Sequence, residues 1–509
     1  MSQQKSSSTI AKNTVFLYVR LLFTIFITFF TSRVVLQVLG VEDFGIFNVV
    51  GSVVAMFSFL NSGMIQASQR FMSFQMGKGD ERSLKDVFSS SLLIHILIGA
   101  IVFVGVESIG VWFLNAKMNI APERMYAANW VLQCSLLGFS ISVITVPFYA
   151  ETIAHEKMGV YAIVGLVDSL LKLGAIYLVK YSSFDNLIFY SILLLVIPTL
   201  ELIVYSIYCK KHFSEVSFRP RYVKGMFVSI LSFAGWSFVG NMGFTGRNAG
   251  VNIVINMLCG VAVNAARGIA YQVSSAIVGF ASNFQMAIVP QITKRYAVND
   301  ISSMLKLVTR GSKLSFILLF LMALPLSLRI DYILELWLGN VPEYTAEFVS
   351  LVLVVCILDS MVIPLGKAID ATGNIKWFQI SVSVVMLLDI PVCYLILMMG
   401  VEPYLALIGS MMVSMAGMCV RIIIVKRRFP AFSVFGYLRD VLFKCLLAAA
   451  MSYFICRFVN SFIPEGFFGL IAACLVILLI TAANFFILAL DKEDKAIIKD
   501  IVVSKIKRR

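Results

Sequence analysis

The sequence has few ionisable residues for its length. Only 14% of its 509 residues are Asp, Glu, Lys or Arg, and only three are histidine. So few charges cannot cover the surface of a water-soluble protein of this size, which excludes an ordinary soluble domain. The histidines are His95, His155 and His212, and they are widely separated along the chain. No histidine cluster therefore indicates acid–base or metal chemistry.

Motifs of catalysis and of cofactor binding are also lacking. The sequence contains no glycine-rich phosphate loop, no nucleophile elbow and no metal-binding motif. The nine cysteines lie in or at the ends of apolar segments, without the spacing of a disulfide framework or a zinc site. We therefore predict a protein that is not an enzyme and that has no cofactor and no metal site. If transport across a membrane is its function, H+ or Na+ is the candidate coupling ion.

Long apolar segments make up most of the chain. Hydrophobic residues account for 60% of the sequence. Runs of about 20 such residues can cross a bilayer core about 30 Å thick, and about fourteen runs of this kind can be placed. They cover residues 13–38, 46–68, 88–114, 125–149, 159–179, 186–208, 233–258, 262–289, 313–328, 347–366, 377–398, 403–425, 437–456 and 467–490. The sequence thus predicts an all-α integral membrane protein with about 14 transmembrane helices.

Positive charges alternate between the predicted loops. The net charge is +14, but the basic residues gather in every second loop rather than in one patch. The basic loops lie near residues 70–85, 210–224, 294–310 and 426–428. The positive-inside rule places these loops and both termini in the cytoplasm. The charge therefore indicates membrane topology, and we expect no nucleic-acid partner.

A polar, basic stretch at residues 209–225 divides the predicted helices into two groups. Residues 1–208 form an N-terminal lobe of six helices, residues 226–428 form a C-terminal lobe of six, and residues 429–490 add two more. In residues 491–509, Ile and Val side chains fall on one helical face with Lys and Arg around them. This tail is predicted to be an amphipathic helix on the anionic inner leaflet.

The two lobes show traces of an internal repeat. A shift of about 220 residues lays Gly40 on Gly260 and Asp80 on Asp300, among other identities, without gaps. Six helices per repeat keep the same orientation across the membrane. We therefore predict two six-helix lobes related by a pseudo-two-fold axis along the membrane normal.

The apolar segment at residues 236–271 carries an unusual number of polar side chains. They are Asn241, Arg247, Asn248, Asn252, Asn256, Asn264 and Arg267. An arginine in the bilayer core costs about 3 kcal/mol on insertion scales, so these cations should face a polar cavity rather than lipid. Arg20, roughly 10 Å inside the first predicted helix, is expected to face a cavity as well. The pattern predicts a polar pathway for an anionic cargo.

Carboxylates within the predicted helices are the candidate ion-coupling residues. Asp168 and Lys172 are four residues apart and share a helix face, where they form either a structural ion pair or a coupling site. Asp359 and Asp389 lie near mid-membrane without an obvious local cation, and each either couples transport to an ion gradient or bonds a neighbouring helix. Glu201 is close enough to the inner surface for its side chain to reach water.

Several short phrases resemble those of a known family. They are VLGVEDFG at 38–45, VNAARGIA at 263–270, PQITK at 290–294, LWLG at 336–339 and ATG at 371–373. In this order and spacing they resemble bacterial polysaccharide-biosynthesis membrane proteins, the Wzx-type oligosaccharide flippases. These belong to the multidrug/oligosaccharidyl-lipid/polysaccharide (MOP) exporter superfamily, which also holds multidrug and toxin extrusion (MATE) antiporters and the lipid II flippase. The resemblance implies a V-shaped pair of lobes around a cavity that opens alternately to each side.

The cargo implied by the resemblance is an undecaprenyl-diphosphate-linked oligosaccharide. A diphosphate needs cations in the cavity, which Arg20, Arg247 and Arg267 supply. Many drug exporters of the superfamily carry an aspartate in the first helix, whereas residues 13–38 contain no acidic residue. These charges favour the lipid-linked glycan over a cationic drug.

We therefore predict a multi-pass flippase of the bacterial inner membrane that serves O-antigen, capsule or exopolysaccharide synthesis. Its partners would be the polyprenyl-diphosphate-linked glycan and membrane lipids, with a polysaccharide polymerase and glycosyltransferases as further candidates. The main alternative is a MATE-type cation-coupled multidrug antiporter. A lipid II flippase and a membrane scaffold for glycan assembly are further alternatives.

Overall fold

The chain is helical in the computed structural model, which describes residues 2–55, 58–118, 120–216, 222–339, 341–491 and 493–496. No strand occurs within these ranges. Thirteen helices in them are long and apolar enough to cross a membrane. This confirms the prediction of an all-α, multi-pass membrane protein. The remaining predicted span, 46–68, runs across residues 56–57, which lie outside the described ranges.

The helices group into two compact units, an N-terminal unit of Lys12–Phe238 and a C-terminal unit of Val239–Arg509 with Met1–Ala11. The change from one unit to the other at Val239 falls inside a long helix, whereas the predicted linker was 209–225. Helices suit such a chain because each backbone N–H and C=O is satisfied within its own segment when no water is present.

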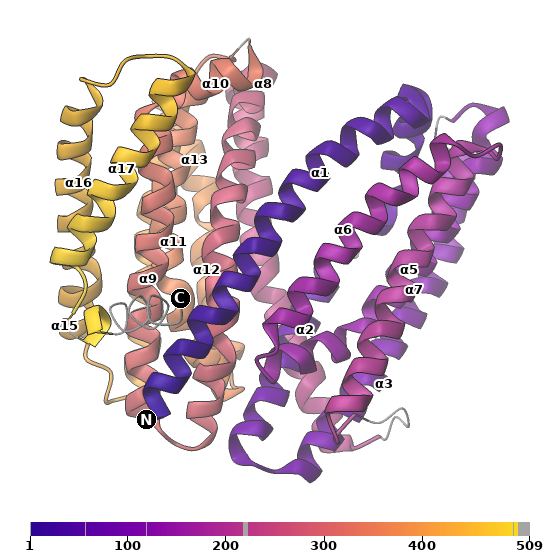
Figure 1. Cartoon of the computed structure of the whole chain (residues 1–509), viewed down its shortest axis with the longest axis horizontal. Helices are drawn as coiled ribbons and strands as arrows, with labels where there is room; N and C mark the ends of the chain where they lie inside the picture. The colour runs from indigo at the N-terminus through magenta and orange to yellow at the C-terminus, as the bar shows by residue number, and fades with distance from the viewer. Residues whose placement is uncertain are drawn as a thin grey trace, which may run out of the picture. The chain divides into compact units, whose positions relative to one another are not determined.

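The N-terminal unit is built around one central helix (Figure 1). Its elements are α1 (Ser2–Ala55), α2 (Ser58–Lys78), α3 (Glu81–Gly105), α4 (Val111–Lys117), α5 (Met125–Ala154), α6 (Met158–Lys180) and α7 (Asn186–His212). Helix α5 packs against α2, α3, α6 and α7. At the start of α5, Arg124 bridges Asp43 and Asp185 at 2.5 and 2.6 Å. These two contacts tie the N-terminal end of α5 to α1 and to Asp185, the N-cap residue of α7.

The C-terminal unit has α11 at its centre, packed against α9 and α14. Its elements are most of α8 (Lys224–Ala297), then α9 (Ile301–Leu328), α10 (Ile330–Leu338), α11 (Thr345–Thr372), α12 (Lys376–Leu387), α13 (Asp389–Met398), α14 (Ala406–Arg428), α15 (Val434–Tyr437), α16 (Lys444–Asn460) and α17 (Phe467–Leu488). Helices α12 and α13 form a single span that is broken at Leu388.

The residues matched by the 220-residue shift have the same local geometry in both copies. Gly40 interrupts α1 at φ 77° and ψ 172°, and Gly260 interrupts α8 at φ 86° and ψ 177°. A positive φ of this kind is readily adopted only by glycine. Asp80 and Asp300 each cap the helix that follows, accepting a hydrogen bond from the backbone N–H three residues on. The repeat is therefore present in the backbone as well as in the sequence.

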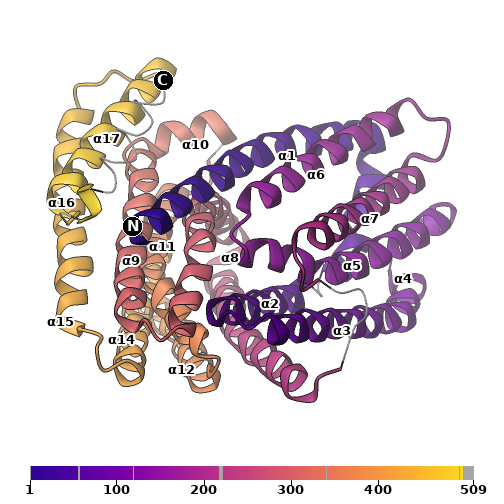
Figure 2. The same ribbon diagram turned by 60° about the horizontal axis from the view of Figure 1, so that its bottom comes forward.

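The last two helices lie beside α9 in both views (Figures 1 and 2). Near one end of α9, Arg329 donates hydrogen bonds to Asn460 Oδ1 at 2.7 Å and to the Ile463 carbonyl at 2.8 Å. Near the middle of α9, the buried Lys313 pairs with Asp491 and Asp494. The apolar layer between these anchors includes the core around Leu324. The predicted amphipathic tail lies outside the described ranges at residue 492 and from 497 onward.

Candidate functional site

Glycines on one face of α8 bring this helix close to α12 and α13. Gly240, Gly243, Gly246 and Gly250 face Gln379, Ser383, Leu387 and Ile390 in turn. A Cβ atom at Gly243 would lie only 2.6 Å from the Cβ of Ser383. Close approach through small residues is a common way for helices to pack in membranes. This face places Arg247, one turn beyond Gly243, next to the α12–α13 break.

Asp389 is the first residue of α13 and lies at that break. Pro391 has no N–H, so the Leu387 carbonyl loses its helical hydrogen bond and the helix is weakened here. The Asp389 side chain is 1% exposed, and its Oδ1 accepts a hydrogen bond from Ser410 Oγ at 2.9 Å. A buried carboxylate in this position needs a cation.

Arg247 supplies the cation. Its Nε donates to Asp389 Oδ2 at 2.6 Å, and its Nη1 donates to Asp359 Oδ2 at 3.1 Å. Its Nη2 donates to the Ser410 carbonyl and to Ser414 Oγ, both at 3.2 Å. Of the two alternatives for Asp359 and Asp389, the structure shows the bond to a neighbouring helix, since both pair with Arg247 of α8, and ion coupling stays a prediction. Their partner lies 112 and 142 residues away in the sequence, where no local pattern reveals it.

Arg421 on α14 also belongs to this cluster and was missed by the sequence analysis. It is buried and interacts electrostatically with Asp359 and with Arg247. The formal charges of the two arginines and the two aspartates balance. Asp359 is the most accessible member, with 21% of its side chain exposed, and its Oδ1 accepts no hydrogen bond from the described residues.

Arg267 lies on the part of α8 that follows the break at Gly260, and its surroundings differ from those of Arg247. Its Nη1 donates to Asn252 Oδ1 at 2.8 Å, and its guanidinium carbon lies 4.4 Å from the ring centroid of Tyr271. Its Nη2 donates to the Asn248 carbonyl at 3.3 Å. Among the described residues no carboxylate pairs with Arg267, and its Nε has no acceptor. Its positive charge is thus held in place without being neutralised.

The predicted asparagines divide into different environments. Asn252 holds Arg267, whereas Asn241 is half-buried and Asn256 is exposed. Asn264 has a buried side-chain oxygen that accepts no hydrogen bond from the described part of the chain. Asn252 is thus the predicted asparagine whose side chain accepts a hydrogen bond from an arginine in the structure.

Arg20 lies in the N-terminal unit, on α1 against α6. Its guanidinium carbon is 4.3 Å from the ring centroid of Tyr161, and its Nε is buried without an acceptor among the described residues. A Cβ atom at Gly165 would overlap this Nε. The absence of a side chain at position 165 therefore leaves room for the arginine.

Asp168 and Lys172 form an ion pair in the same unit, with Nζ 2.8 Å from Oδ2. Together with Glu201 they line a cavity of about 260 Å³ whose walls include Ser142 and Pro198. Glu201 comes from α7 and the ion pair from α6, two helices that pack against each other. The expectation that Glu201 reaches water at the inner surface stays a prediction. Two carboxylates and one ammonium group make this a second polar site within a membrane-spanning bundle.

Comparison with known proteins shows the fold. No protein-family model matches the sequence, and no curated protein matches it. The structure is similar to a MATE transporter in the straight conformation, with a TM-score of 0.72 and 13% identity over 83% of this chain and 96% of that one. It is equally similar to an outward-facing multidrug resistance MATE family transporter of the MOP superfamily, with a TM-score of 0.71 and 12% identity over 84% and 98%.

A third similar structure is a MOP superfamily transporter from Pyrococcus furiosus, described as having a binding pocket of reverse polarity that suggests a different function. Its TM-score is 0.70, with 12% identity over 84% of this chain and 98% of that one. At these identities the likeness concerns the fold, which is that of MATE transporters of the MOP superfamily.

Proposed function

We propose that this chain is a flippase that moves polyprenyl-diphosphate-linked oligosaccharide repeat units across the bacterial cytoplasmic membrane, for O-antigen, capsule or exopolysaccharide synthesis. The observation that carries the proposal is Arg267, a buried arginine whose charge no described carboxylate neutralises, within a MOP transporter fold. A guanidinium group suits a diphosphate because it presents several donors in one plane.

In the proposed mechanism the chain holds the cargo by its charged end. Arg267 binds the diphosphate through the guanidinium edge that Asn252 and Tyr271 leave free. Asn256 and Asn264 hydrogen-bond the first sugars, Arg20 provides a further cation, and the polyprenyl tail stays in lipid. The two units then expose the site alternately to the two sides of the membrane.

Ion coupling would act through the carboxylates that hold the other cations. Protonation of Asp359, or binding of Na+ to it, weakens its bond to Arg247 and leaves this arginine to Asp389 alone. Binding of an ion at Asp168 would release Lys172 in the same way. A change of one charge in a buried network is enough to favour a second helix arrangement.

The second candidate function is cation-coupled multidrug antiport. Two observations favour it: the carboxylates Asp168 and Glu201 line a cavity, and one similar structure is a multidrug resistance MATE transporter. The arginines of α8 argue against a cationic cargo, since like charges repel it. A lipid II flippase would share the diphosphate chemistry but carry a different glycan, and a scaffold would not need the polar face of α8.

The test is to deplete the protein in its native bacterium and measure polyprenyl-diphosphate glycans by mass spectrometry, with a leaflet-specific protection assay. We expect complete repeat units to accumulate on the inner leaflet. In complementation, Arg267→Gln should lower export about 10- to 100-fold, because a charge-assisted bond contributes roughly 1.5–3 kcal/mol. Arg439→Gln, which changes an exposed arginine, should export normally.

Unchanged lipid-linked glycans, together with altered sensitivity to cationic compounds, would refute flipping and favour drug antiport. Accumulation of lipid II alone would identify the lipid II alternative. If Arg267→Gln exported glycan normally at wild-type protein levels, Arg267 would not be the diphosphate ligand.

A further inference from the structure

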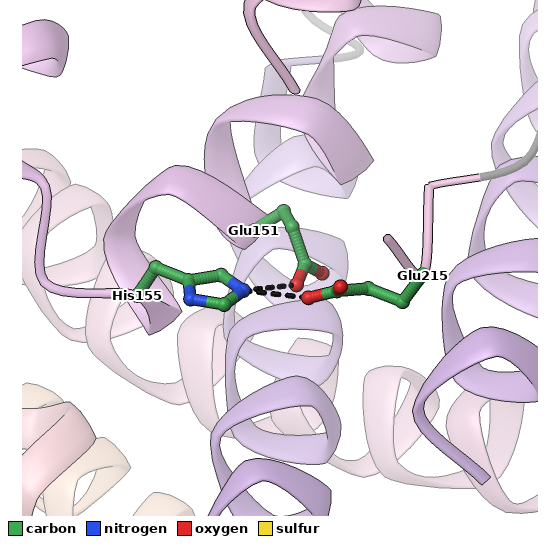
Figure 3. A group of neighbouring side chains, drawn as sticks. All are labelled: Glu151, His155 and Glu215. Carbon is green, nitrogen blue, oxygen red and sulfur yellow. Dashed lines mark hydrogen bonds and ion pairs between the residues drawn. The ribbon is translucent and has the colours of Figure 1, made fainter. Parts of the chain in front are cut away.

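Three potential metal ligands converge at the C-terminal end of α5 in the N-terminal unit (Figure 3). His155 Nε2 lies 2.6 Å from Glu215 Oε1 and 3.2 Å from Glu151 Oε1. In the figure the ring nitrogen points between the two carboxylates. One ligand atom from each residue lies within 4.8 Å of the other two. None of these residues takes part in the proposed transport site.

The local fold fixes these side chains before any ligand binds. Glu151 and His155 are four residues apart at the end of α5, so they share a face. Glu156 then adopts a left-handed conformation, at φ 61°, and its carbonyl accepts a hydrogen bond from Asn13 at 3.1 Å. The ring of Phe213 stacks on His155 with centroids 3.9 Å apart, and Glu215 follows two residues later. These contacts hold the imidazole ring of His155 in place between the two carboxylates.

The hydrogen bonds within this group leave one buried carboxylate without a donor. Glu151 is completely buried, and neither of its carboxylate oxygens accepts a hydrogen bond from the described residues. His155 Nε2 carries at most one hydrogen, and the 2.6 Å contact directs it to Glu215. Glu151 is left aimed at the site without a donor of its own.

We propose that Glu151, His155 and Glu215 bind a divalent transition-metal ion of the Zn²⁺ class. One imidazole nitrogen and two carboxylate oxygens are ligands that Zn²⁺ takes readily, and the two carboxylates balance its charge. Bonds of about 2.0–2.2 Å in a tetrahedron place ligand atoms roughly 3.3–3.6 Å apart. The 3.2 Å contact is already close to this length, and the 2.6 Å contact would widen.

Binding requires His155 to release its Nε2 proton to solvent and to keep one on Nδ1. The ring is 29% exposed, so a water molecule can complete the fourth position. The metal would join the C-terminal end of α5 to the segment that follows α7. This inference goes beyond the proposed transport function and does not depend on it. It also departs from the expectation of no metal site.

The experiment uses the full chain, purified in detergent with a histidine-free tag and stripped with chelator. Zn²⁺ is titrated in competition with a chromophoric chelator, and the bound ions are counted. We expect one tightly bound Zn²⁺ per chain. Glu151→Gln, His155→Gln and Glu215→Gln should each weaken binding about 10- to 100-fold or more. His212→Gln is the matched control, because it removes a nearby exposed histidine that lies outside the group.

A second readout keeps the test valid if a helix variant fails to fold. Co²⁺ bound to the wild-type chain should give the visible absorption of a tetrahedral site. Glu215→His, on the segment after α7, replaces one ligand with another and should keep both the Co²⁺ spectrum and Zn²⁺ binding, whereas Glu215→Gln should lose them. The proposal is overturned if the wild-type chain binds no Zn²⁺ at micromolar concentrations, or if all three Gln variants bind it like the wild type.

Discussion

Arg247 and Arg267 lie twenty residues apart on α8, yet their surroundings give them different properties. Arg247 is held by two aspartates, so its charge is cancelled and its position is fixed. Arg267 is held by an asparagine, a carbonyl and an aromatic ring, none of which carries a negative charge. At the scale of single residues, Arg247 is neutralised by its neighbours, whereas Arg267 keeps its positive charge, which is why we propose Arg267 as the ligand of the anionic cargo.

The Arg247–Asp389 contact should show strong energetic coupling. Arg247→Gln leaves the buried Asp389 without its cation and should lower the free energy of unfolding by about 3–5 kcal/mol. Asp389→Asn should be destabilising for the converse reason. The double variant should be less destabilised than the sum by roughly 1–3 kcal/mol, measured by denaturant titration in mixed micelles.

Arg439 and Asp440 provide the control, because their ion pair lies at the surface and such pairs contribute little. Their double-mutant cycle should show no measurable coupling. Additive effects of Arg247→Gln and Asp389→Asn would mean that the 2.6 Å contact does not stabilise the fold.

At the scale of elements, the glycine face of α8 determines whether the charged cluster can form. Gly243 lies one turn before Arg247 and touches Ser383 of α12, whose Oγ donates a hydrogen bond to the Val239 carbonyl at 3.1 Å. The close approach of the α8 backbone to α12 and α13 thus brings Arg247 within reach of Asp389.

Gly243→Ala should therefore push α8 away from α12. The new Cβ would lie 2.6 Å from Ser383, and overpacking of this kind costs about 1–3 kcal/mol. We expect a lower free energy of unfolding and reduced export in the glycan assay. In Gly268→Ala, on the same helix, the added methyl group meets no atom within 4 Å. That variant should be neutral or more stable by up to about 1 kcal/mol; equal effects of the two changes would contradict the close-packing argument.

At the scale of the whole molecule, the internal repeat gives the two units matching helix starts, at α3 in one and at α9 in the other. Asp80 caps α3 and Asp300 caps α9, each through the backbone N–H three residues on. The hydrogen bond from Ser83 lowers the pKa of Asp80 below its ordinary value of 3.8. The cap therefore stabilises the fold above that pH, and its contribution is lost as the pH falls through the lowered value.

Asp80→Ala and Asp300→Ala should each lower the unfolding temperature at neutral pH, because each leaves helix-start N–H groups without an acceptor. The two caps belong to different units and share no partner, so the double variant should show the sum of the two shifts. Asp→Asn at either position keeps an acceptor and should change little. A double variant no worse than either single variant would show that the caps are not independent.

The sequence by itself determined the helical class, nearly all of the membrane spans and the repeat. These follow from local properties: the length of apolar runs, the loop charges, and glycines such as Gly40 and Gly260 that alone tolerate the backbone at a break. The polar residues of α8 and the pairing of Asp168 with Lys172 are visible for the same reason, since they lie within one helix.

Only the tertiary structure decided which charges meet. Asp359 and Asp389 find Arg247 across more than a hundred residues, Glu201 faces the Asp168 cavity, and Glu215 completes a group with His155. Hydropathy cannot predict such partners, because a helix that is apolar on most sides gives no preferred rotation until its neighbours are in place. Burial then forces each charge to find a counterion, and packing, not sequence distance, selects it.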